Sequence, residues 1–446
     1  MPDNRILIDP SESRIRVARR VLRLALPIIL SNLLYTVESA FSVILVSGLS
    51  ASAVAAVGYS ASMLWFIYSL MALAYTGTSV LVAQRVGAGK DPSPALLWGI
   101  ILSFLIALPL TFWGKDLVSY LMLTFGASQN VASLAREYLE PVFLFITIGF
   151  ITNAIYAGYN GYGDTKTPFK VALLMNVVNI GSAYLLIYGK FGFPRLEVAG
   201  AGWGIALSEV MGLMFYIYLY AKHRKPFPIK LSLRKDILLQ MLRIGTPTAI
   251  ERGFTSLSFN IFVGLVAQFG DKALAAHQVG LRVESVSFMI GFGMMIASTT
   301  LAGQNYGAKN FKGLDYGVRV SAHTTALIMG LIGLVIALFP QQFSLIFTRD
   351  REVISYAVYY LVIVALSQPQ MAYASIFSGS LKGMGKTHIP LVVNLSSFWL
   401  FRIIPSMIFL KLLPSPIVPW VFMSIETTLR AIIFYWAYKR EIKKNL

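Results

Sequence analysis

The sequence predicts an all-α polytopic membrane protein with twelve transmembrane helices, arranged as two six-helix lobes related by pseudo-two-fold symmetry. Three observations predict this fold class: a very apolar composition, a series of long apolar segments, and an internal repeat. Apolar residues make up 56% of the chain and charged residues only 13%, with a mean hydropathy of +0.67. A soluble globular domain carries about 25% charged residues, so the composition excludes a soluble fold.

The apolar segments are each about 20 residues or longer, which is enough to cross the hydrocarbon core of a bilayer. The first segment follows a polar, arginine-rich start and is long enough to remain in the membrane, so we do not expect a cleaved signal peptide. The expected spans are 22–47, 53–83, 95–125, 134–160, 168–188, 199–221, 238–269, 273–303, 316–345, 353–379, 388–411 and 415–438.

Short motifs that contain proline, glutamine and glycine recur in the same order in the two halves of the chain, at a nearly constant offset in residue number. An internal repeat in a membrane bundle is typical of transporters that rock one half against the other. The corresponding pairs are Pro27 with Pro247, Gln84–Ala88 with Gln304–Ala308, and Gly161–Pro168 with Gly383–Pro390.

One connection, residues 222–236, is the most charged and separates the sixth span from the seventh. It predicts a cytoplasmic linker between an N-terminal lobe at 14–221 and a C-terminal lobe at 237–440. Because each lobe has an even number of spans, both lobes enter the membrane in the same sense, and we expect them to enclose a central cavity.

The net charge of +18 is explained by basic residues that concentrate on one side of the membrane. With the N-terminus inside, most Lys and Arg residues fall in the tails and the even-numbered connections, Lys382 among them, so both termini are predicted to be cytoplasmic in the cell (inner) membrane. These residues are expected to contact anionic lipid headgroups, and their distribution excludes a nucleic-acid face. The basic residues assigned to the other side are Lys115, Arg136, Lys190, Arg195, Lys272, Arg349, Arg351 and Lys411.

The sequence offers little for catalysis or for a bound metal. It has no Cys, and its four His residues are scattered singly, so no zinc constellation is visible. The segment 161–168 resembles a phosphate loop only superficially, because it lacks the preceding strand and the full spacing. We therefore predict no enzyme activity.

Pro27 and Pro247 lie just inside the first span of each half. A proline within a helix removes a backbone hydrogen bond and bends the helix. Most prolines in the spans are interpreted as structural, but the repeat preserves these two, and a bend there could serve as a gate.

Six acidic residues within the expected spans are weighed here, because an ionisable side chain in the membrane interior is costly and needs a partner or a function. Glu426 and Arg430 are four residues apart on one helix and predict a salt bridge. Glu140 lies near an outer end, close to Arg136, and could be solvated, whereas Glu209 is left open between packing and function. The remaining acidic residues, Glu38, Glu251 and Glu284, are the sharper candidates.

Glu251 follows Pro247 by one helical turn and Glu38 follows Pro27 by three turns. Desolvation disfavours the ionised form of a carboxyl group, so such a side chain can bind a proton and release it when a cationic substrate arrives. The alternative is that Arg252 or Arg282 neutralises these carboxylates. Glu251 and Arg252 point about 100° apart on a helix and would pair poorly.

Amide side chains within the spans are predicted to line the interior, since an unsatisfied amide in lipid is costly. Asn176 and Asn179 share a helix face. Methionine and aromatic residues of the eighth span could form an adaptable wall for flat hydrophobic molecules or could simply pack. The amides taken as candidate binding residues are Asn153, Asn179 and Gln278, with Arg282 as a charged neighbour.

Several stretches resemble the multidrug and toxic compound extrusion (MATE) transporters. The resemblance covers nearly the whole chain and implies twelve helices in two lobes, with efflux of cationic or amphiphilic compounds in exchange for protons or sodium. The matching stretches are Leu26–Asn32, Ala83–Gly89, Gly161–Pro168, Ala275–Gln278 and Gly303–Ala308.

Within that family the chain looks more similar to the DinF-like branch than to the NorM-like branch. The stretch 369–380, upstream of Leu381-Lys382-Gly383, has no acidic residue where the NorM-like branch carries Asp. The position of the usual first-helix Asp of the DinF-like branch is Ser42, and Glu38, one turn earlier, could substitute for it.

The function predicted is a secondary antiporter that exports organic cations or amphiphilic drugs, with a proton or a sodium ion as the coupling ion and no other cofactor. We expect small molecules and membrane lipid as partners, and no obligate protein partner. The alternative in the same superfamily is a flippase for lipid-linked precursors, for which Arg252, Arg282 and Arg402 would receive an anionic substrate. A passive channel or a membrane-embedded enzyme is the alternative from a different class.

Overall fold

The computed structural model describes residues 5–124, 126–224 and 226–445. These residues form α-helices, together with a 3-10 turn at Lys190–Gly192 and a π-helical segment at Phe398–Ile403, and no strand occurs among them. The predicted all-α class is therefore confirmed. Lys225 of the predicted linker lies outside the described residues.

The helices follow the expected spans closely. The first half contains α1 (Arg14–Ser47), α2 (Ala51–Gly87), α3 (Ser93–Thr124), α4 (Gln129–Leu144), α5 (Ile146–Tyr162), α6 (Lys166–Tyr188) and α7 (Val198–His223). The second half contains α8 (Lys235–Ala267), α9 (Asp271–Gly307), α10 (Phe311–Leu338), α11 (Pro340–Leu345), α12 (Arg351–Leu366), α13 (Gln368–Gly383), α14 (His388–Ser397), α15 (Ile404–Phe409) and α16 (Ile417–Lys443).

Two expected spans are each broken into a pair of helices. The pair α4 and α5 is bent by 54°, and the pair α12 and α13 is bent by 52°. Pro141 lies in the last turn of α4, and Pro369 lies in the first turn of α13, so a proline accompanies each bend. Counting each bent pair, α10 with the short α11, and the run α14 to α15 as one span each gives twelve membrane segments within the described residues.

The two bent pairs repeat each other closely. Helices α4 and α12 have the same length, and a single residue separates each of them from the helix that follows, α5 or α13. Ser128 caps the N-terminus of α4, and its counterpart Asp350 caps α12 by accepting hydrogen bonds from two backbone N–H groups. Gly163 and Gly385, which follow α5 and α13, have positive φ angles of 94° and 78°, a conformation that only glycine adopts easily. The repeat predicted from sequence is confirmed.

By length and composition, nine helices of the described residues qualify as membrane spans, and the two bent pairs bring the number to eleven. Helix α8 does not pass that test, and it carries Glu251 and Arg252 near its middle. With α8 as the twelfth segment, the chain is a multi-pass membrane protein.

Contacts divide the chain into two compact units. The N-terminal unit comprises Leu30–Val82 and Asp91–Ala249, and the C-terminal unit comprises Met1–Ile29, Ala83–Lys90 and Ile250–Leu446. This division differs from the lobe boundaries at 14–221 and 237–440, which stay a prediction, because the first parts of α1 and α8 each group with the other half of the sequence.

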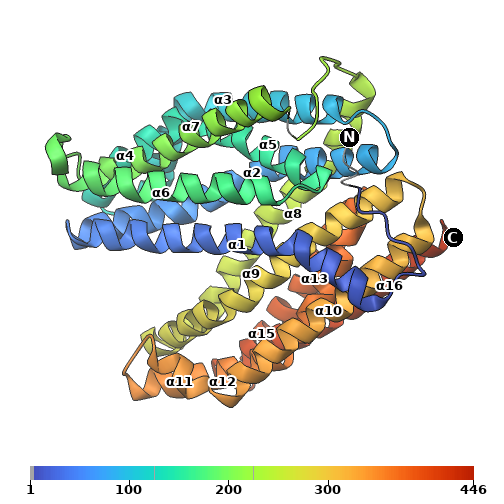
Figure 1. Ribbon diagram of the computed structural model, residues 1–446. Helices are drawn as coiled ribbons and strands as arrows, with labels where there is room; N and C mark the ends of the chain where they lie inside the picture. The colour runs from blue at the N-terminus through green and yellow to red at the C-terminus, as the bar shows by residue number, and fades with distance from the viewer. Residues whose placement is uncertain (1–4, 125, 225, 446) are drawn as a thin grey trace. The chain divides into compact units, whose positions relative to one another are not determined.

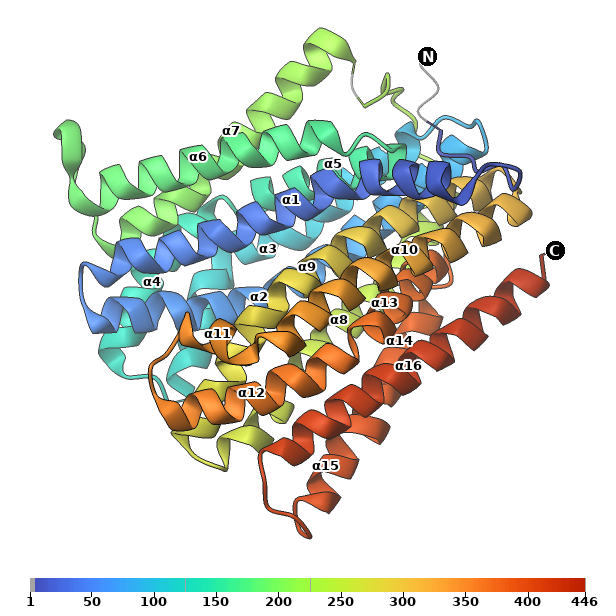
Figure 2. The same ribbon diagram turned by 60° about the horizontal axis from the view of Figure 1, so that its bottom comes forward.

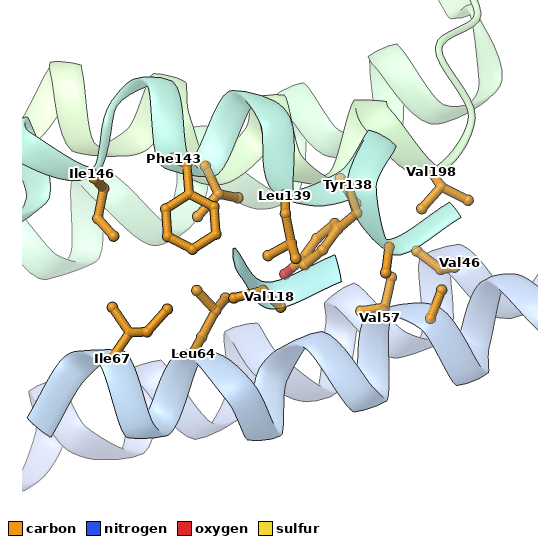
Figure 3. Close-up of a cluster of buried hydrophobic side chains, with 14 of the residues drawn as sticks. Val46, Val57, Leu64, Ile67, Val118, Tyr138, Leu139, Phe143, Ile146 and Val198 are labelled. Carbon is orange, nitrogen blue, oxygen red and sulfur yellow. The ribbon is translucent and has the colours of Figure 1, made fainter. Parts of the chain in front are cut away.

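The N-terminal unit holds a cluster of buried apolar side chains from several helices. Leu64 and Ile67 on α2 face Leu139 and Phe143 on α4 (Figure 3). In the same unit α6 packs along α7 (Figure 1). In a membrane the lipid is as apolar as these side chains, so close van der Waals packing holds the helices together.

The C-terminal unit is built around α9 and α13, which pack against each other and against α10 (Figure 2). Its buried cluster includes Phe262, Tyr360 and Trp420, which are almost completely inaccessible. This cluster is where the polar groups of the unit gather, as described next.

Candidate functional site

The candidate carboxylates of the N-terminal unit are Glu38 on α1 and Glu209 on α7. The buried amide of Asn179, on α6, donates a hydrogen bond to Glu38. Oε2 of Glu209 is buried without a hydrogen-bond partner among the described residues, and the two carboxylates are close enough to interact electrostatically. An acidic pair with one amide donor leaves charge that an incoming cation can neutralise.

Glu251, on α8 of the C-terminal unit, is ion-paired. Nζ of Lys382 lies 2.9 Å from Oε2 of Glu251 and donates to Oε1 at 3.0 Å, while Nδ2 of Asn394 donates to Oε1 at 2.6 Å. The side chains of Glu251 and Lys382 are only 8% and 10% exposed. Arg252 does not neutralise Glu251; its guanidinium lies 5.9 Å from the centre of the Phe292 ring.

The position of Lys382 corrects the sequence analysis. The residue was assigned to a cytoplasmic connection, but it lies in the last turn of α13 and is buried. The predicted span stopped at residue 379, so the helix is longer than expected, and the lysine points to a carboxylate within the protein.

Glu284, on α9, is held by neutral groups. Oη of Tyr360 donates to its Oε2 at 2.7 Å, and Nε2 of Gln368 donates to its Oε1 at 3.4 Å. Arg282, the predicted alternative partner, is exposed. Glu284 forms none of the ion pairs found among the described residues, so its charge has no cationic partner at contact distance.

The salt bridge predicted between Glu426 and Arg430 is present, with Nε and Oε1 3.1 Å apart. Arg402 joins it from the π-helical segment and ion-pairs with the same carboxylate. Its guanidinium also lies 4.2 Å from the centre of the Phe398 ring. Arg402 is therefore occupied, which removes one of the arginines on which the flippase alternative depended.

The other predicted residues are scattered. Gln278 is exposed, Asn153 is half-buried, and Asn176 is buried, with its Nδ2 donating to the Ala172 carbonyl of its own helix. Glu140 is exposed and ion-pairs with Lys115. Among the described residues, no group of three His, Asp or Glu side chains converges in a way that could hold a metal ion.

Pro27 and Pro247 lie inside α1 and α8, as expected. The boundary between the two compact units falls between Ile29 and Leu30 and again between Ala249 and Ile250. Each boundary follows the proline by less than one helical turn, so each of these helices changes unit immediately after it.

Twelve helical segments built from a duplicated half, with carboxylates held by hydrogen bonds or an ion pair inside each unit, define a transporter of the duplicated-bundle class. The family model MatE matches residues 27–185 and 247–408, two ranges that begin at the corresponding prolines Pro27 and Pro247. The chain belongs to this family of multidrug efflux transporters.

Known relatives cover most or nearly all of the chain. It is 30% identical over 449 residues to the probable multidrug resistance protein NorM of Thermotoga maritima, covering 97% of this chain and 95% of that protein. It is 26% identical to the multidrug resistance protein NorM of Vibrio cholerae, covering 82% and 81%. The predicted closeness to the DinF-like branch stays a prediction.

Among solved structures, a crystal structure of a MATE protein in the straight conformation matches with a TM-score of 0.89 at 22% identity, covering 96% of this chain and 97% of that chain. A transporter from Pyrococcus furiosus, described as having a binding pocket of reversed polarity, matches with a TM-score of 0.86, also at 22% identity, covering 96% of each chain. At this identity the likeness shows the fold.

Sequence reasoning missed Tyr360, Gln368 and Lys382. All three are on α12 or α13, the bent pair of the second half, and each faces a carboxylate from another helix. A lysine next to the glycine marks of the repeat was the one available signal, and it was interpreted as a loop charge.

Proposed function

We propose that the protein is a secondary active antiporter that exports organic cations or amphiphilic drugs in exchange for protons or sodium ions, by alternating access. It would lie in the cell (inner) membrane with both termini in the cytoplasm, because the positive charges concentrate on that side. The relatives named as multidrug resistance proteins support small-molecule drugs as substrates.

The observation that carries the proposal is a set of carboxylates held inside the two units: half-buried Glu38 in the N-terminal unit, and buried Glu251 with half-buried Glu284 in the C-terminal unit. A carboxylate in the membrane interior is costly unless it is paired or neutralised. Binding either the coupling ion or the charge of the substrate neutralises it, and competition between these two ligands is what exchange requires. Asn179 supports Glu38 by donating to it.

The prolines give the proposal a mechanical element. Because α1 and α8 pass from one unit to the other just after Pro27 and Pro247, a change of bend at these residues would move one unit against the other. Replacing each proline with alanine restores the missing backbone N–H. We expect slower export with unchanged affinity for the substrate.

The test is efflux of ethidium, a fluorescent organic cation, from proteoliposomes, with pH and sodium gradients imposed separately. We expect one gradient to drive export and its dissipation to abolish it. Glu38→Gln and Glu251→Gln should lower gradient-driven export at least tenfold. Glu140→Gln, at an exposed carboxylate paired with Lys115, is the matched control and should behave like the unmodified protein. Export that ignores both gradients in folded protein contradicts the proposal.

A further inference from the structure

Glu284 has surroundings unlike those of Glu251. The nearest polar groups are the Tyr360 hydroxyl and the Gln368 amide nitrogen, which both donate hydrogen bonds to it. Glu251, in contrast, faces the ammonium group of Lys382. The Glu284 carboxylate is therefore stabilised by neutral donors, and its full negative charge remains available to a ligand.

The orientation of the Gln368 amide is fixed from its other side. Oγ of Ser287 donates to Oε1 of Gln368 at 2.5 Å, and both residues are buried. Ser287 is three residues after Glu284 on α9, so the two side chains share a helix face. With its oxygen already engaged, Gln368 presents its NH₂ group to the carboxylate and to the Val364 carbonyl.

The Tyr360 hydroxyl is equally constrained. The ring is completely buried and meets His277 and Trp420 edge to face, with ring centres 5.3 Å and 5.5 Å apart. Gly280 leaves room for it, because a Cβ atom at that position would overlap the Tyr360 ring. A phenol packed in this way keeps its hydroxyl aimed at Glu284.

This set of groups discriminates between the two candidate coupling ions. A bare cation needs several oxygen ligands to replace its hydration shell. Around Glu284 the amide oxygen of Gln368 is taken by Ser287, and its nitrogen faces the carboxylate. Among the hydrogen bonds of the described residues, the Tyr360 hydroxyl is the neutral oxygen that contacts the carboxylate directly. A proton needs no such shell, because the carboxyl group itself holds it and Tyr360 can donate to the remaining carbonyl oxygen.

The charged and titratable groups around Glu284 come from three elements. Tyr360 reaches it from α12, and His277 packs against Tyr360 from α9. Arg402, on the π-helical segment, is the nearest cation of that segment, and it is ion-paired with Glu426.

We propose that Glu284, with Tyr360 and Gln368, is a proton-binding site of the C-terminal unit that does not accept sodium. The inference rests on the proposed exchange function, because it names the coupling ion at one of its carboxylates. When Glu284 is ionised, the two donors hold the charge. When it takes up a proton on Oε1, the site becomes neutral, and Tyr360 keeps its hydrogen bond to Oε2.

The test is infrared difference spectroscopy of the purified full-length protein as the pH is changed, which detects the C=O band of a protonated carboxyl group. We expect a titrating carboxyl band that is lost in Glu284→Gln and kept in the control Glu140→Gln. Tyr360→Phe should move the band to higher frequency, since the carbonyl loses a hydrogen bond. Replacing choline chloride with sodium chloride at constant pH should leave the band unchanged.

Two results would overturn the inference: a carboxyl difference spectrum from which Glu284→Gln removes no component, or a Glu284 component that sodium removes at constant pH. If Glu284→Gln does not fold, a carboxyl band that keeps its frequency in Tyr360→Phe would also overturn the inference. The infrared spectra are recorded without substrate or gradient, so the two proposals can fail separately. Ethidium export that depends on neither gradient would contradict the exchange function alone. An absent carboxyl band would contradict this proton site alone.

Discussion

Gly87 and Gln304 are in backbone contact, since a Cβ atom on Gly87 would overlap the Gln304 carbonyl group. The repeat makes this contact twice: Gly307 lies in the same way against the Gln84 carbonyl. Gln84 and Gly87 are the counterparts of Gln304 and Gly307 in the repeat, so the ends of α2 and α9 cross symmetrically. This reciprocal pairing is the signature of a two-fold relation between the repeated motifs.

Alanine at Gly87 or at Gly307 is expected to force these helix ends apart. Overpacking of this kind costs about 1–3 kcal/mol, and the contact is with backbone, which cannot move aside as a side chain can. Thermal and denaturant unfolding in detergent measure the effect. Gly58→Ala is the matched control on α2, because a Cβ atom there meets nothing within 4 Å. Equal stability of Gly58→Ala and Gly87→Ala would show that the close approach is unimportant.

Lys382→Met should destabilise the protein strongly, because it leaves the carboxylate of Glu251 buried and without its cation. Removing one partner of a buried ion pair costs about 3–5 kcal/mol. Adding Glu251→Gln should recover most of the loss, since glutamine is neutral and can still accept from Asn394. Lys115→Met, which breaks the exposed pair with Glu140, should cost less than about 1 kcal/mol. Additive effects in the double variant would contradict the coupling.

Local signals in the sequence predicted much of the fold. The composition and the long apolar segments predicted the spans, and fixed offsets between small residues predicted a duplication that the helix boundaries repeat. The pairing of Glu426 with Arg430 was predictable because the two residues are one helical turn apart. Each of these signals depends on neighbours in the chain or on a periodic pattern.

The partners of the candidate carboxylates could not be predicted in this way. Lys382 is 131 residues from Glu251, and Tyr360 is 76 residues from Glu284. Only helix packing brings them together, and no periodicity indicates which faces meet. The same reason explains why Arg402, on a π-helical segment that shifts the register of its side chains, was not expected to bind Glu426.

The protection of the backbone amides at the N-terminus of α12 from hydrogen exchange should depend on pH, because Asp350 caps these amides in its ionised form. The backbone N–H groups of Glu352 and Val353 hold the pKa of this exposed carboxyl below its ordinary value of 3.8. Because the pKa of Asp350 is lower in the folded state, the ionised cap stabilises the protein fully at pH values above the pKa of the unfolded state. This stabilisation disappears as the pH falls through the pKa of the folded state. The protection factor of the amides in the first turn of α12, which compares the observed exchange rate with the intrinsic rate at the same pH, should therefore fall at acidic pH, and Asp350→Ala should remove that dependence. Asp350→Asn should keep the cap at every pH.

The segment before α1 should be held in place by three amide side chains of the C-terminal unit: Asn305, Asn310, and Gln304, whose Oε1 accepts from the Ile6 N–H at 2.6 Å. Oδ1 of Asn305 accepts from the Ile8 N–H at 3.0 Å and its Nδ2 donates to the Ile6 carbonyl at 2.8 Å, while Nδ2 of Asn310 donates to the Ile8 carbonyl at 2.8 Å. This pattern satisfies a buried extended backbone that has no strand beside it.

Asn305→Ala removes both the acceptor for Ile8 N–H and the donor for Ile6, which leaves two backbone groups unpaired. We expect hydrogen exchange at the Ile8 amide to accelerate at least tenfold, because an unmade buried hydrogen bond costs about 1–3 kcal/mol and the segment can leave its site at that cost. Asn260→Ala is the control, since that side chain bonds only to its own helix at Ser256. If the Ile8 amide exchanged at the same rate in both variants, the remaining bonds from Gln304 and Asn310, together with the apolar side chain of Ile8 buried against α10, would be sufficient to hold the segment.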